Sequence, residues 1–319
     1  MRRRRVLVRG TLGVALAAVV FFVVVPRIAS YGSIGSRLAA VSTSWALVLA
    51  GGAILDILVT ALPWRVLLPQ LSGPAALGFT QASTAVTAVV PGGAPLGMAV
   101  SFGLLRRLRV GGGEAAFAVG LAGIWSQVMI FVYPLAGAVL VLGTGHLSGT
   151  TLAIALGSGA AAAIVVLVAV AAFRSARVAR RLGERFVRLR DERLLHLRSR
   201  WPALTAATVV NHLSGYLLLV LTLRAVGVPF RTLPLSETFL AWSIGRVISS
   251  LPLTPAGIGV VELGLIGALV GFGGPHALVV AAVLLYRALI VVPTLVVGFA
   301  SLLALRYGSA STTSSRGSS

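Results

Sequence analysis

Long apolar runs recur along the whole chain and predict membrane-spanning helices. Six of these runs are long enough to cross a bilayer, since a helix rises about 1.5 Å per residue and the hydrocarbon core is about 30 Å thick. The pattern therefore predicts an all-α polytopic membrane protein. The predicted spans are Val6–Val25, Trp45–Leu62, Ala115–Leu142, Thr151–Phe173, Pro202–Val226 and Ala277–Leu305.

Two further apolar segments are interrupted. Ala75–Leu105 breaks at Pro91-Gly92-Gly93-Ala94-Pro95, and Leu235–Gly271 breaks between Leu251 and Gly257. The arms on either side have about 12 to 17 residues, which is too short for a crossing, so we predict two re-entrant broken hairpins. Non-helical backbone at membrane depth is tolerated only where protein or a water-filled cavity satisfies it. Such breaks are typical of transport paths and binding sites.

The order span, broken hairpin, span occurs twice, in residues 45–142 and again in residues 202–305. Pro95 and Gly97 match Pro255 and Gly257 at an offset of about 160 residues. The predicted crossings give the two copies opposite orientations, so they form an inverted repeat. Repeats of this kind place a substrate site near the bilayer midplane, between the copies.

Composition supports the membrane assignment. The 319 residues are 57% hydrophobic, more than a soluble core can hide, and the net charge is +20. All 27 basic residues are Arg and gather at segment ends, which indicates topology and anionic headgroups rather than nucleic acid. We expect one integral membrane domain over residues 1–307 and a disordered Ser/Thr/Gly-rich tail over residues 308–319.

The arginines also predict the topology. With the N-terminus in the cytoplasm, Arg65, the Arg106-Arg107-Arg109 cluster and the basic loop 174–200 all lie inside. We therefore expect a multi-pass plasma-membrane protein with both termini cytoplasmic. The loop fits either an interfacial amphipathic segment on anionic lipid or a solvated topology determinant with no further role.

Charged residues within the apolar segments are the main functional candidates, because charge inside a bilayer is costly. Arg246 and Arg287 are placed to hold an anionic headgroup, with Glu262 compensating charge or engaging a cationic group. The half-helix start near Gly257 and Gly259 offers further N–H donors to the anion. The alternative is an internal ion pair of Glu262 with either arginine, which holds the hairpin in place.

The remaining polar residues suggest lesser roles. Asp56 lies mid-span and is either a proton-coupling group or the partner of an Arg in the other copy. Glu114 and Glu237 are read as first-turn helix charges, and His212 with Asn211 as helix-to-helix hydrogen-bonding groups. Four scattered His and no Cys give no metal signature, so we expect neither a metal nor another cofactor.

Enzyme templates do not fit. The chain has no Lys, hence no Walker A lysine and no Schiff-base nucleophile. It also has no Gly-x-Ser-x-Gly elbow and no His-Glu-x-x-His motif. We therefore expect a protein that is not an enzyme.

At its breaks the chain resembles the membrane domain of lysylphosphatidylglycerol synthases and the stand-alone flippase-like proteins related to it. The segment Leu251 to Glu262 looks like that family's Pro-x-Thr-Pro-Gly-Gly-x-Gly-x-x-Glu break, although Ala256 replaces the first Gly of the pair. The first break resembles the family's less closely, since many relatives carry a Glu and an Arg where this chain has Leu96 to Val100. The substrate-binding or translocation residues thus expected are Asp56, Pro91, Gly92, Gly93, Arg246, Thr254, Pro255, Gly257, Gly259, Glu262, Tyr286 and Arg287.

The resemblance implies movement of a lipid between leaflets. The lipid is expected to be an anionic or aminoacylated phospholipid or a polyprenyl-linked lipid. The sequence holds no soluble aminoacyl-transferase domain, so lipid aminoacylation is not predicted. The alternative is a non-transporting, lipid-binding scaffold subunit of an envelope-synthesis complex, and a lipid-phosphate transferase ranks last. Expected partners are membrane lipids, a second copy of the chain or an envelope-synthesis enzyme, with no nucleic acid.

Overall fold

The computed structural model describes residues 41–89, 94–143, 148–174, 184–251, 254 and 257–307. Every element over these ranges is a helix, and five helical stretches are long and apolar enough to cross a membrane. The predicted all-α polytopic architecture is confirmed. The predicted span Val6–Val25 and the tail 308–319 lie outside the described residues.

The five long helical stretches match five of the predicted spans within a few residues at most ends. One begins as α4, is capped by Ser42, and continues after a two-residue turn as α5, which has Pro63 in its first turn. The long elements are α4 (Thr43–Val59), α5 (Leu62–Leu67), α8 (Gly112–Val141), α9 (Gly149–Arg174), α11 (Glu184–Ala225) and α14 (His276–Tyr307).

Residues 184–200 of the predicted basic loop 174–200 are helical. Helix α11 begins at Glu184 and runs without interruption into the membrane span that starts at Ser199. The second half of the predicted loop is thus the first part of a 42-residue helix. The helix continues through Pro202, which has no backbone N–H to donate, close to the start of the apolar span.

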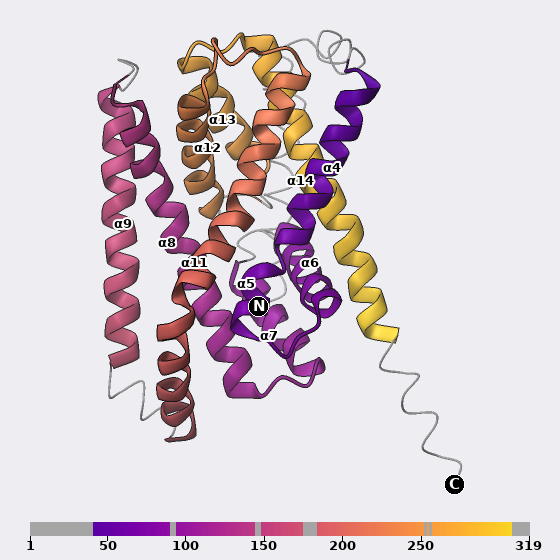
Figure 1. Cartoon of the computed structure of the whole chain (residues 1–319), viewed down its shortest axis with the longest axis vertical. Coiled ribbons are helices and arrows are strands. Elements are labelled where there is room, and N and C mark those ends of the chain that lie inside the picture. The colour runs from indigo at the N-terminus through magenta and orange to yellow at the C-terminus, as the bar shows by residue number, and fades with distance from the viewer. Residues whose placement is uncertain are drawn as a thin grey trace, which may run out of the picture.

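Both broken hairpins are present as pairs of short helices. The first consists of α6 (Gly73–Val89) and α7 (Ala94–Arg107), and the second of α12 (Leu235–Ser250) and α13 (Val260–Gly271). Their lengths of 17, 14, 16 and 12 residues fall short of a crossing. Figure 1 shows the first hairpin at one end of the long helices and the second at the other, so the two enter from opposite sides.

Each hairpin packs against the last span of the other copy. Helix α6 of the first copy packs on α14, the last span of the second copy, and α12 of the second copy packs on α8, the last span of the first. Helices α4 and α11, which occupy the same position in each copy, pack on one another. This reciprocal pattern is that of an inverted repeat whose copies interlock.

Glycines allow the closest approach in both of these contacts. A Cβ at Gly298 of α14 would lie 2.4 Å from the carbonyl oxygen of Gln81 in α6. A Cβ at Gly137 of α8 would lie 3.0 Å from the Cα of Leu240 in α12. Small residues of this kind let helix backbones approach closely in membranes, where tight van der Waals packing drives association.

Each hairpin has its own apolar core. The first is packed around Phe79, Leu104 and Leu105, together with residues of α5 and α8. The second is larger and contains Trp242 and Leu265, with buried residues of α11 and α14. The two clusters are separate, which allows polar side chains from both copies to meet between them.

Replacing Gly298 with Ala should destabilise the protein. The added methyl would meet the α6 backbone and the Cβ of Ala85, so the helices must move apart. We expect a loss of about 1–3 kcal/mol in the free energy of unfolding, the usual cost of overpacking a core. Thermal unfolding in detergent measures it.

Gly120→Ala is the matched control, since nothing lies within 4 Å of a Cβ at that position in α8. It should leave stability unchanged or slightly higher, because Ala favours helix more than Gly does. Equal midpoints for the two variants would contradict the close-approach argument.

Candidate functional site

A polar cavity of about 480 Å³ lies between the two copies. Its lining comes from the long helices of both copies, from both arms of the first hairpin and from α12 of the second. Hydroxyl and amide side chains supply much of its lining, beside apolar residues and few charged groups. The polar lining residues are Asp56, Thr60, Thr80, Gln81, Ser83, Thr84, Thr87, Ser101, Ser126, Thr208, Asn211, His212, Trp242, Arg246, Tyr286 and Thr294.

One carboxylate, Asp56, and one guanidinium, Arg246, face this cavity among the described residues. Asp56 of α4 accepts a hydrogen bond from the Ser214 hydroxyl, with 2.6 Å between the oxygens. Arg246 of α12 lies within electrostatic reach of Asp56, His212 and Tyr286, and its buried Nε has no hydrogen-bond partner in the described part of the chain. No direct ion pair joins Asp56 to Arg246 over these residues. Within the described part of the chain, the charge of Arg246 is therefore not neutralised by a direct ion pair.

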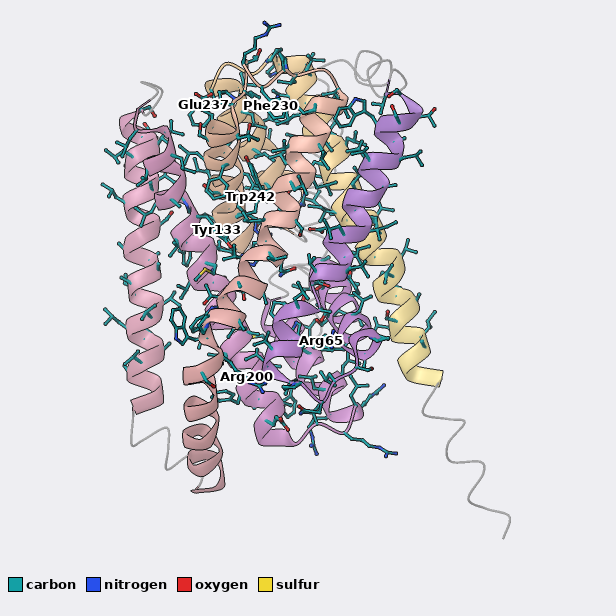
Figure 2. All side chains as sticks on the ribbon, viewed as in Figure 1. Arg65, Tyr133, Arg200, Phe230, Glu237 and Trp242 are labelled. Atoms are coloured by element: carbon teal, nitrogen blue, oxygen red, sulfur yellow. The ribbon has the colours of Figure 1, made fainter. Side chains whose placement is uncertain are left out.

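Gly215 of α11 lets three polar atoms from other helices converge. A Cβ at this position would lie 3.7 Å from the Tyr286 hydroxyl, 3.8 Å from Asp56 Oδ1 and 3.9 Å from Trp242 Nε1. Trp242 also packs against Tyr133 with 5.4 Å between ring centroids, and Figure 2 shows both rings near mid-height of the molecule. These groups from α4, α12 and α14 therefore meet beside α11.

Glu262 and Arg287 form a separate buried node. Arg287 Nε donates to Glu262 Oε1 at 2.8 Å, which ties the start of α13 to α14. The second carboxylate oxygen accepts from the Gly259 backbone N–H at 2.6 Å and caps its own helix. Gly259 has a φ of +88°, a conformation that favours glycine. The Gly259 N–H, one of the helix-start donors predicted to contact an anion, is therefore bonded to Glu262.

The structure thus divides the predicted site residues into two groups. Asp56, Arg246 and Tyr286 line the cavity. The second group surrounds the start of α13 and does not line the cavity; its members are Glu262, Arg287, Gly257 and Gly259. Arg287 pairs with Glu262, in the ion-pair arrangement considered as the alternative for these residues. Thr254 is buried beside the break, while Pro91, Gly92, Gly93 and Pro255 lie outside the described residues.

Two predictions about lesser residues can also be compared with the structure. His212 joins α11 to α8 through Ser126, with 3.1 Å between Nε2 and Oγ, and so makes the expected helix-to-helix hydrogen bond. Glu237 is in the first turn of α12 but is only 2% exposed, so it is a buried group. Glu114 accepts a hydrogen bond from Gln70 in the first turn of α8.

The sequence reasoning missed the polar face of α6. Thr80, Gln81, Ser83, Thr84 and Thr87 all line the cavity. The signal was present as a run of hydroxyl and amide residues at helical spacing inside an otherwise apolar hairpin arm. A search for charged residues does not find this face, because Ser and Thr lower the mean hydropathy of a helix only slightly.

Breaking the Glu262–Arg287 pair from either side should destabilise the fold. The side chains are 3% and 12% exposed, so removing one partner takes a charge-assisted hydrogen bond from the other in a buried place. We expect Glu262→Gln and Arg287→Gln each to cost about 3–5 kcal/mol of unfolding free energy, measured by thermal unfolding in detergent.

The double variant Glu262→Gln/Arg287→Gln provides the control. It removes both charges and should recover part of the loss, giving a coupling energy in the double-mutant cycle. Strictly additive single effects would show that the pair contributes no coupling.

Comparison with known proteins agrees with this architecture. Residues 10–298 match the model of the family described as lysylphosphatidylglycerol synthase TM region. No curated protein matches the chain. Because the match extends over most of the 319 residues, the chain belongs to the lysylphosphatidylglycerol synthase TM region family.

Proposed function

We propose that this multi-pass membrane protein moves a phospholipid or polyprenyl-linked lipid between leaflets, with the headgroup passing through the polar cavity. The family relates the chain to membrane lipids. The observation that carries the proposal is the cavity between the two opposed broken hairpins. Arg246 lines this cavity, and its buried Nε has no hydrogen-bond partner in the described part of the chain. Movement of the headgroup needs such an environment, because hydrocarbon offers polar groups no hydrogen bonds.

Arg246 is proposed as the phosphate-binding group. A guanidinium offers several donors in a planar fork that matches phosphate oxygens. Asp56 on the same cavity would then limit how strongly the anion is held, so that the lipid can leave again. The cavity volume of about 480 Å³ is within the range of small-molecule sites, which suits a headgroup whose acyl chains stay in the bilayer.

The interlocked copies suggest how access alternates. Each hairpin packs on the last span of the other copy, so a rocking of one copy against the other changes the surroundings of the cavity from both sides. No energy source is assigned, and a protein that only facilitates exchange needs none.

The proposed orientation has the termini in the cytoplasm of a plasma-membrane protein. In its support, Arg65 and Arg200 lie near one end of the molecule in Figure 2, while Glu237 lies near the other. Arginine enrichment at one end of the spans is typical of the cytoplasmic side.

Reconstituted protein should carry lipid across the bilayer in an Arg246-dependent way. A phospholipid labelled on a short acyl chain keeps its native headgroup, and a membrane-impermeant quencher reports the fraction exposed outside. We expect that fraction to rise above the outer-leaflet half, and Arg246→Gln to slow the rise roughly tenfold or more, since hydrogen bonds to charged groups contribute about 1.5–3 kcal/mol.

Arg231→Gln is the matched control, because Arg231 is an exposed loop residue that does not line the cavity. It removes the same charge and should leave the rate unchanged. If several lipid classes show no protein-dependent rise, the transport proposal fails and the lipid-binding scaffold becomes the better explanation. Equal slowing by both variants would argue against a specific role for Arg246.

A further inference from the structure

The face of α6 that lines the cavity offers hydrogen-bond acceptors. Thr80, Thr84 and Thr87 each donate their hydroxyl proton to the backbone carbonyl four residues earlier, at 2.6, 2.8 and 2.9 Å. A hydroxyl has one proton and two lone pairs. With the proton directed at its own helix, each of these oxygens can only accept a hydrogen bond from a ligand.

Gln81 extends the acceptor face. Its Nε2 donates to Thr60 Oγ1 at 3.1 Å, and Thr60 in turn donates to the Ile57 carbonyl at 2.6 Å. Since Thr60 has no second proton to give, this contact requires the amide nitrogen of Gln81, which sets the amide orientation. The remaining Oε1 is buried and has no hydrogen-bond partner in the described part of the chain, and the residue is 1% exposed.

A buried acceptor without a partner is costly, so this lining is suited to a ligand that brings donors. Arg246 on the same cavity has donors only and suits an anion. A single headgroup that satisfies both carries a phosphate and, beside it, hydroxyl or ammonium groups.

We propose that the α6 face formed by Thr80, Gln81, Thr84 and Thr87 is a donor-recognising subsite for the lipid headgroup. The inference rests on the proposed function and names its substrate class, a phosphodiester lipid whose headgroup bears hydrogen-bond donors. Headgroups without donors, such as choline or a simple methyl ester of the phosphate, leave the acceptors unsatisfied and are poor substrates.

Two pairs of acyl-labelled lipids test this in the reconstituted system. Phosphatidylglycerol and phosphatidylmethanol have the same charge and differ in the glycerol hydroxyls. Phosphatidylethanolamine and phosphatidylcholine are both zwitterionic and differ in the ammonium protons. We expect the donor-bearing member of at least one pair to move about threefold to tenfold faster, the range that one typical net hydrogen bond gives. The pair that shows the difference identifies hydroxyl or ammonium as the source of the donors.

Thr84→Val tests the subsite itself. It keeps the shape of a residue exposed to the cavity and removes the acceptor, so the preference should fall by about threefold or more. Gln81→Leu is the second variant and should act in the same direction. Thr222→Val is the matched control, because Thr222 also bonds its hydroxyl to its own helix but does not line the cavity.

The outcomes separate this inference from the proposed function. Equal rates within both pairs, at a rate that still depends on Arg246, would overturn the donor subsite and leave lipid movement in place. A preference that survives Thr84→Val and Gln81→Leu would also overturn it. If none of the four lipids moves between leaflets, both proposals are wrong.

Discussion

A helix that enters the bilayer but is too short to cross it has one end at membrane depth, where the protein must satisfy the terminal backbone groups. The second hairpin meets this constraint through one carboxylate. Glu262 accepts from the Gly259 N–H at the start of α13 and from the Arg287 side chain on α14. The same group therefore caps the helix, holds it to the neighbouring span and neutralises the buried arginine. The break in the hairpin is stable because these three needs are met together.

The cavity follows from where the short helices stop. Each hairpin fills part of the space between the long helices and packs on a span of the opposite copy, which leaves a polar volume lined by both copies. Charge within it is sparse, with Asp56 and Arg246 among hydroxyl, amide and apolar side chains. A site of this kind holds a polar group without trapping it, because no cluster of like charges binds one ion tightly.

Much of the architecture could be predicted from the sequence because apolar length and helix breaking are local properties. The Pro and Gly residues between Pro91 and Pro95 and between Pro252 and Gly257 predict an interruption in each hairpin, because both residue types disfavour a helix interior. The sequence did not decide which arginine pairs with Glu262. The pairing depends on how α14 packs against α13, and residues 262 and 287 lie in different helices. The sequence shows the hydroxyl and amide groups of α6. It does not show the direction of the hydroxyl protons, which the local helix sets, so the acceptor face was missed.

The packing of each hairpin on the other copy also constrains how the chain is made. Helix α6 is synthesised early, yet its main packing partner, α14, is the last helix described. During synthesis the first hairpin must therefore wait, with its hydroxyls and Gln81 in place but without the surface that covers them, until the final span has entered the membrane. Until then, the buried polar groups of α6, Gln81 among them, lack the packing that α14 gives them in the complete fold.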